Sequence, residues 1–228
     1  MVCYKTFKYL CQRRCKLIGI KRPIDHIVFA VQHLDKAVSN FQEKFGVCPI
    51  FGGYHRTQGT KNALVKLNDR TYLELLASDH HNQDILPPRW MGVDILSRNQ
   101  ITRWAIRSQK LQEDRKIILR HHEHMGTIAE GSRVTANGSE LTWQLLVPLA
   151  VPEVELIPFA IDWSSSATHP CDVMPEMGCE LIELYGTHPN PDQFVELFEA
   201  LGLELQLIKS KEISLKATLK TPRGIFEI

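Results

Sequence analysis

The stretch from residue 23 to residue 77 constrains the fold of this chain more than any other part. It opens with a short apolar run at residues 24–31 and continues with a helical pattern at residues 34–45, which ends at Gly46. Three strand-like runs follow, and the last of them covers residues 71–76. The order strand, helix, strand, strand, strand predicts one βαβββ module.

Two side chains in this module suggest a site. His26 lies in the first expected strand and Glu74 lies in the last one, far away in sequence. If these two strands are neighbours in one sheet, the imidazole and the carboxylate lie side by side. Both groups are common ligands of divalent metal ions, so the pair is a candidate metal site.

The same order of elements occurs again in residues 101–163. An alternating strand at 101–107 precedes a long helical segment at 109–125, and Asn137-Gly138 predicts a hairpin turn between two later strands. The final strand of this second copy covers residues 156–163, where Pro158 indicates an edge or a bulge.

A third copy covers residues 179–228, with a helix at 191–201 that ends at Gly202. The last strands of the three copies align, and a carboxylate recurs at one position, as Glu74, Asp162 and Glu227. An internal repeat explains these three matches together better than any of them separately.

Composition excludes several classes of protein. The chain has 228 residues and a formal net charge of +1, so charge suggests neither a nucleic acid nor a membrane as partner. No apolar run approaches the ~20 residues of a membrane helix. The six cysteines are irregularly spaced, without a CxxC pair. We therefore expect free thiols in a reducing cytoplasm.

Segments of different composition separate the copies. Residues 1–22 are basic and contain no acid, so we expect a surface helix or a frayed extension, with a transit peptide as the minor alternative. Residues 80–100 are polar, and residues 164–178 form a linker rich in Ser, Pro and His. Linkers of this length often form the rim of a functional site.

Several motifs resemble a known family. They are Asp25-His26-Ile27-Val28, Leu34-Asp35-Lys36-Ala37-Val38 with Phe41, Gly46-Val47, Asn62-Ala63-Leu64-Val65 and Tyr72-Leu73-Glu74-Leu75. In these motifs the chain resembles the glyoxalase-like domains of the vicinal oxygen chelate superfamily. The resemblance implies an α+β fold in which modules 23–77 and 101–163 pair into an incomplete curled barrel around a cavity, within a domain at residues 23–163. A third module at 179–228 would follow.

The resemblance also implies a ligand set. In this superfamily the first and fourth strands of each paired module supply the metal ligands, which gives His26, Glu74, Asp162 and either Arg103 or Trp104. Because the last position offers no ligand, we expect at most three: His26, Glu74 and Asp162. The ion would be Zn, Fe, Mn, Ni or Mg. Glu74 or Asp162 is the candidate catalytic base.

Other side chains would contact the substrate. Tyr72, Trp104 and Trp143 lie on strands that would line the cavity, and aromatic walls suit a small organic ligand. Asn62 belongs to a Thr-x-Asn-x-Leu motif of the resembled domain. Arg103 is a candidate contact for an anionic ligand, as is Arg133.

Three functional hypotheses follow. The first is a divalent-metal-dependent lyase, isomerase or dioxygenase-like enzyme that acts on a small oxygenated substrate. The second is a non-catalytic protein that binds or sequesters a small molecule without metal. The third is a scaffold that uses the third module for association. Because this module has no fourth partner in the chain, it either packs on the paired modules or pairs with the third module of another chain, and the second arrangement predicts a homodimer. Because no glutathione-specific motif is present, glyoxalase I activity is not the first expectation.

Overall fold

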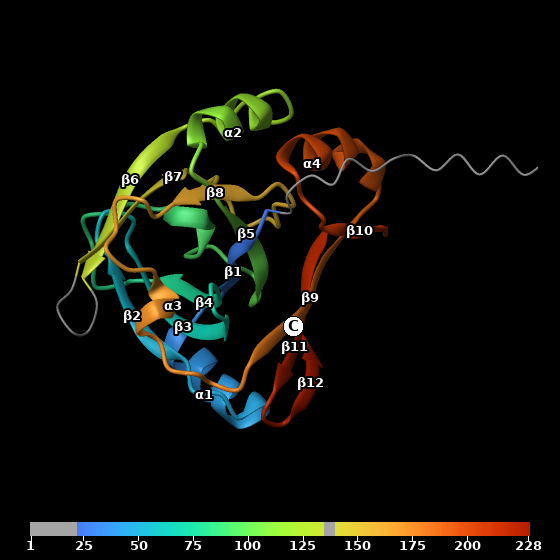
Figure 1. The fold of residues 1–228 in the computed structure, drawn as a ribbon. Helices are drawn as coiled ribbons and strands as arrows, with labels where there is room; N and C mark the ends of the chain where they lie inside the picture. Colours follow the sequence, from blue (N-terminus) through green and yellow to red (C-terminus); the bar gives the residue numbers. More distant parts are fainter. Residues whose placement is uncertain (1–21, 135–139) are drawn as a thin grey trace, which may run out of the picture.

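The computed structural model describes residues 22–134 and 140–228, and these form an α+β fold with two sheets (Figure 1). The expected fold class is therefore confirmed. The strands of the larger sheet are β1 (Ile24–Ala30), β2 (Ile50–His55), β3 (Thr60–Asn68), β4 (Thr71–Ser78), β5 (Gln100–Arg107), β6 (Ile128–Val134), β7 (Glu140–Leu146) and β8 (Phe159–Asp162). The strands of the smaller sheet are β9 (Glu180–His188), β10 (Gln206–Lys209), β11 (Ser214–Thr221) and β12 (Gly224–Glu227).

The larger sheet contains both expected modules. Its strand order is β2-β3-β4-β1-β5-β8-β7-β6, so the first strand of each module pairs with the fourth strand of the same module. β1 and β5 join the two modules in the middle. Strands β2 and β6 lie at opposite ends of this order, yet they contact each other. The sheet therefore curls into a nearly closed barrel, as Figure 1 shows.

The helices lie in the segments that connect the strands. They are α1 (Leu34–Phe45), α2 (Leu111–Ile118), α3 (Pro170–Val173) and α4 (Val195–Leu201), with 3-10 turns η1 (Trp90–Gly92) and η2 (Pro191–Phe194). Helix α1 has the predicted bounds and ends at Gly46, whose φ of 71° is left-handed. Helix α2 is shorter than predicted, because residues 120–124 are almost entirely polar and offer no face to bury.

The third module has the predicted order of elements but a different pairing. Its strand order is β10-β9-β11-β12, so β12 is an edge strand that pairs with β11 and not with β9. In the first module the fourth strand β4 instead lies beside the first strand β1. Glu227 is therefore not placed in the third module as Glu74 is in the first. Periodicity identifies strands, but their neighbours depend on tertiary packing.

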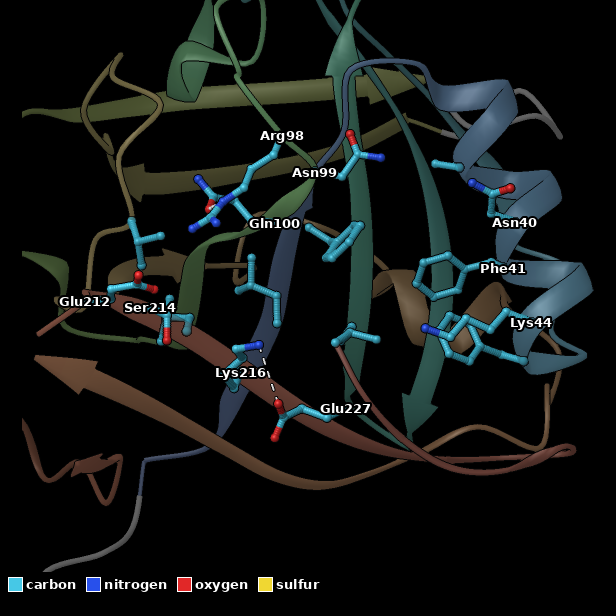
Figure 2. A pocket seen from close by; sticks show the side chains of 17 residues that line it. Asn40, Phe41, Lys44, Arg98, Asn99, Gln100, Glu212, Ser214, Lys216 and Glu227 are labelled. Atoms are coloured by element: carbon cyan, nitrogen blue, oxygen red, sulfur yellow. Dashed lines mark hydrogen bonds and ion pairs between the residues drawn. The ribbon is translucent and has the colours of Figure 1, made fainter. Parts of the chain in front are cut away.

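The smaller sheet packs against the larger one through a shared core. Leu184, Leu215 and Leu219 belong to the same buried cluster as Ile27 and Phe41. Between α1, the residues before β5 and the strand β11 lies a cavity of about 450 Å³ (Figure 2). Its lining includes the rings of Phe29 and Phe41 and an ion pair of 3.5 Å between Lys216 and Glu227.

Some sequence predictions lie outside the described residues, namely those on residues 1–21 and the turn at 136–139. Arg22 is described, and its guanidinium pairs with buried Asp114 at 2.7 Å. Cys48, Cys171 and Cys179 are free thiols. In the part of the chain that the structure describes, no helix has the length and apolar character needed to cross a bilayer.

Candidate functional site

A small cavity lined by both polar and apolar side chains lies inside the barrel. Its volume is about 20 Å³, and it adjoins a larger cavity of about 820 Å³. Arg133 and Trp143 line both cavities and so mark their junction. The small cavity is lined by His26, His55, Asn62, Tyr72, Glu74, Trp90, Arg133, Trp143, Leu145, Phe159, Ile161 and Trp163.

Strand pairing brings His26 and Glu74 together, as the sequence predicted. In the parallel β1–β4 pair, His26 lies opposite Tyr72 and Val28 lies opposite Glu74, so these side chains share one face of the sheet. The His26 Nε2 atom is 3.8 Å from the Glu74 Oε2 atom. The imidazole also stacks on the Tyr72 ring, with centroids 4.7 Å apart.

Asp25 orients the His26 ring. The Asp25 Oδ1 atom lies 2.8 Å from His26 Nδ1, although adjacent residues of a regular strand face opposite sides. A register shift in the β1–β5 pairing between Ile24 and His26 distorts the strand here. Irregularities of this kind re-aim side chains, and they are frequent beside active sites.

Three more donors surround the buried Asp25 carboxylate. They are His169 Nε2 at 3.2 Å, Trp163 Nε1 at 3.2 Å and Arg107 Nε at 3.3 Å. Burial alone would raise the pKa of Asp25, but the hydrogen bonds and charges of His169 and His26 outweigh it and hold that pKa well below its usual range. Asp25 is therefore an anion that only accepts hydrogen bonds.

These bonds assign the proton on His26. His26 Nδ1 donates to the anionic Asp25 carboxylate, so in a neutral imidazole the Nε2 atom keeps a free lone pair. That lone pair faces the Glu74 carboxylate, which is itself an acceptor, at 3.8 Å. Two acceptors that face each other across this distance create a place for a proton or a metal cation.

His55 is a third side chain that could bind a metal ion beside His26 and Glu74. Burial lowers the pKa of His55 to about 4, even though the nearby Glu74 charge raises it, so the ring is neutral at pH 7. Its Nδ1 contacts Thr60 Oγ1 at 2.9 Å, and its Nε2 lies 3.9 Å from Glu74 Oε1. The arrangement resembles that of His26, because Nδ1 has a hydrogen-bond partner and Nε2 faces the Glu74 carboxylate.

Asn62 connects this cluster to the second module. Its Nδ2 donates to Glu74 Oε1 at 2.6 Å and lies 3.4 Å from His55 Nε2. Its Oδ1 accepts from Arg133 Nη1 at 3.2 Å. The Asn62 amide thus links the Arg133 guanidinium to the Glu74 carboxylate through two hydrogen bonds.

The donor types in this cluster fit a divalent metal. Two imidazole nitrogens and a carboxylate suit Zn, Fe, Mn or Ni. Two donors that share an ion at about 2.1 Å each lie at most about 4.2 Å apart, and the distances of 3.8 and 3.9 Å satisfy this limit. Within residues 22–134 and 140–228, however, no three His, Cys, Asp or Glu side chains are already gathered into a metal-binding group. Asn62 would have to release Glu74.

Asp162 is not part of this cluster, which corrects its expected roles as metal ligand and base. Phe159, Ile161 and Trp163 line the cavity, so the alternating residue Asp162 faces the other side of β8. Its carboxylate accepts the Ser164 N–H at 2.8 Å. The alignment of the repeats was wrong by one residue, which turns a side chain to the opposite face.

Arg103 and Trp104 are also absent from the cavity lining, which corrects their expected contact with substrate. The Arg103 guanidinium donates to the backbone carbonyls of Leu149 and Val151, at 3.2 and 2.8 Å, and so holds the loop after β7. The Trp104 indole N–H donates to the Leu156 carbonyl at 2.9 Å within the main core. Asn62, Tyr72 and Trp143 do line the cavity, as expected.

Sequence reasoning missed Asp25, His55 and His169. Asp25 precedes the recognised His26, but its inward contact depends on the strand irregularity. His55 ends β2 and His169 precedes Pro170, and no local pattern joins either residue to Glu74 or to Asp25. Each reaches the site through long-range packing.

Comparisons with known proteins show what this chain is similar to. A model of the glyoxalase-like domain family matches residues 24–202. A hypothetical protein from Staphylococcus aureus is similar in structure, with a TM-score of 0.57 and 18% identity over 90% of this chain and 84% of that one. A methylmalonyl-CoA epimerase variant from Streptomyces coelicolor, bound to 2-nitronate-propionyl-CoA, shares 20% identity over 66% of this chain and 100% of its own, with a TM-score of 0.43. No curated protein matches the sequence.

Proposed function

The chain belongs to the glyoxalase-like domain family, and we propose that it is a metal-assisted isomerase or lyase that moves a proton on a small oxygenated substrate. One observation carries the proposal. His26 Nε2 and His55 Nε2 both face the Glu74 carboxylate, and the far nitrogen of each ring is held, by Asp25 and by Thr60. Such partners set the tautomer and orientation of metal-binding histidines.

His26, His55 and Glu74 would hold the ion. When bound, it would supply Lewis acidity that polarises a carbonyl oxygen and so acidifies the neighbouring C–H bond. The remaining chemistry belongs to the chain. Glu74 is the carboxylate in the cavity that can take a proton from carbon and return it. Glu74 can do so only after the Asn62 amide, which donates to its Oε1 atom in this structure, has released it.

Tyr72 and the apolar residues around the cavity support this transfer. Burial, with the charges of Asp25 and Glu74, raises the pKa of Tyr72 well above its ordinary value. The phenol therefore keeps its proton at neutral pH. Phe159 and Ile161 exclude water from the opposite side, which strengthens the electrostatic interactions inside the cavity.

Metal content is the direct test. Elemental mass spectrometry of the purified, untagged protein is expected to find about one equivalent of a divalent transition metal, which His26→Ala and His55→Ala lose. His188→Ala, at the end of strand β9 in the smaller sheet, is the matched control and retains it. If the folded wild type takes up no metal on soaking, the metal-assisted mechanism is wrong.

Deuterium exchange tests the proton transfer separately. Incubation with small 2-oxo and 2-hydroxy carbonyl compounds in D₂O is expected to label the carbon next to the carbonyl. This readout does not require the product to be known. Absence of exchange with every compound, in a protein that holds its metal, would contradict an isomerase or lyase.

A second candidate function is a metal-free binding protein. The 2.6 Å bond from Asn62 to Glu74 favours it, because the carboxylate already has a partner. Native mass spectrometry would then detect a bound organic molecule that His26→Ala still retains.

The homodimer and the cytoplasmic location stay predictions. Light scattering after size-exclusion chromatography tests the homodimer.

A further inference from the structure

We infer that the substrate carries a carboxylate, which the indole N–H of Trp143 and the Nε–H of Arg133 bind at the junction of the two cavities. This inference rests on the proposed function, since it names the class of substrate for the same site. Its starting observation is a pair of hydrogen-bond donors that have no acceptor.

Both donors are buried. Trp143 is 5% exposed and Arg133 is 6% exposed, and both line the small and the large cavity. Among the described residues, Trp143 Nε1 and Arg133 Nε have no hydrogen-bond partner. A buried donor without an acceptor is costly, so such groups call for an explanation. A ligand oxygen would satisfy each of them.

Strand register places Arg133 and Trp143 at diagonal positions on one face of the sheet. In the antiparallel β6–β7 pair, Gly131 lies opposite Trp143 and Arg133 lies opposite Leu141. A Cβ atom added at Gly131 would lie 2.4 Å from Trp143 Nε1. The indole N–H therefore occupies the space that a side chain at 131 would fill, two residues from Arg133 on the same face of β6.

The orientation of Arg133 is fixed from the other side. Its Nη1 donates to Asn62 Oδ1, and a Cβ added at Gly52 would lie 2.5 Å from that nitrogen. Gly52 thus leaves the space in which the guanidinium meets Asn62. With Nη1 occupied there, Nε is free to bind a ligand, and the partner Asn62 connects the bound ligand to Glu74.

The donors and charges fit a carboxylate rather than a phosphate. Two fixed N–H groups match the two oxygens of a planar monoanion. Of the described side chains around the small cavity, Arg133 alone carries a permanent positive charge. The larger cavity adds Arg56, but also the acidic side chains Glu130 and Glu140. A phosphate dianion would need a larger excess of positive charge than this set supplies.

The two volumes limit the shape of the substrate. About 20 Å³ beside Glu74 admits only the few atoms that react, whereas about 820 Å³ beyond the junction admits a larger group. The carboxylate at the junction is then a near neighbour of the reacting carbon. A 2-oxo or 2-hydroxy acid with its remaining substituent in the larger cavity has this arrangement.

Calorimetric titration with 2-oxobutanoate and with its neutral amide tests the inference. Wild type is expected to bind the acid at least about tenfold more tightly than the amide, because one charge-assisted hydrogen bond contributes that much. Trp143→Phe and Arg133→Met are each expected to weaken binding of the acid by about tenfold or more. Trp104→Phe and Arg98→Met remove the same groups elsewhere and should leave affinity unchanged.

Two outcomes would overturn the inference: equal affinity for acid and amide, or unchanged affinity in Trp143→Phe. Either would mean that these two donors do not hold the carboxylate. Trp143→Phe keeps the test decisive if Arg133→Met does not fold. If the acid binds through these two residues but no metal or deuterium exchange is found, the proposed mechanism fails and the carboxylate site stands.

Discussion

The two modules of the barrel contribute opposite kinds of side chain to one cavity. The first supplies the polar wall, which we define as His26, His55, Asn62, Tyr72 and Glu74. The second supplies the apolar wall, defined as Trp143, Leu145, Phe159, Ile161 and Trp163, to which it adds Arg133. The strand order within the two modules is the same, so the difference lies in the side chains alone.

This difference shows how a duplicated scaffold can divide its tasks. The polar wall holds the groups that titrate or bind metal, and each is oriented by a partner outside the cavity or beside it. The apolar wall excludes water and gives the cavity its shape. The second module therefore has no metal ligands at the described positions that correspond to those of the first, because it places Phe159 and Ile161 on its inward face.

The largest expected effect comes from Glu74→Gln, which keeps the shape of the polar wall and removes its charge. Deuterium exchange into substrate should fall by about 10²- to 10⁴-fold, the usual contribution of a positioned acid or base. Asp162→Asn makes the same chemical change on the outside of β8 and should stay within about twofold of wild type. A similar loss of deuterium exchange in both variants would mean that Asp162 also acts in the site.

Asp25→Asn tests whether the polar wall depends on the buried Asp25 carboxylate. The variant leaves the donors of His26, His169 and Trp163 without an anion, and the free energy of unfolding at pH 7 should fall by about 3–5 kcal/mol. Urea denaturation measures this loss. Because the pKa of Asp25 is lowered in the folded protein, the difference from wild type should shrink as the pH falls below about 3.9. A constant difference down to pH 2 would contradict this.

His55 should make stability depend on pH. Its folded pKa of about 4 lies below the ordinary value of 6.5, so the unfolded chain binds more protons between these two values. The free energy of unfolding should therefore fall, by at most about 3 kcal/mol, as the pH decreases from 6.5 to 4. Thermal melts across this range should show a smaller slope in His55→Gln, and an equal slope would assign the effect to other groups.

The smallest effect should come from the apolar wall. Ile161→Val removes one methyl group and should lower the free energy of unfolding by about 1 kcal/mol, without any change in metal content. Chemical denaturation and elemental analysis of one preparation give both values. A loss of metal from this variant would mean that the two walls do not act separately.

The sequence was sufficient for the modules and for half of the site. Periodicity and helix-ending glycines define strands and helices locally, and they place His26 and Glu74 on the first and last strands of one module. The pairing of two modules into a barrel was predicted from the resemblance to glyoxalase-like domains. Asp162 could not be placed, because one residue of register decides which face it takes. His55 and His169 could not be found, because their partners Glu74 and Asp25 come from distant strands. The pairing of the third module likewise depends on packing rather than on pattern.

The common core of the two sheets has a consequence for how the protein unfolds. Leu184, Leu215 and Leu219 of the smaller sheet share one buried cluster with Ile27 of the central barrel strand. Calorimetry of the whole chain is therefore expected to show a single cooperative transition, with equal calorimetric and van't Hoff enthalpies. Removing residues 179–228 would expose the apolar face that this sheet covers. The shortened chain would lose the barrel and its cavity together, so the third module acts as part of the folding unit that holds the site.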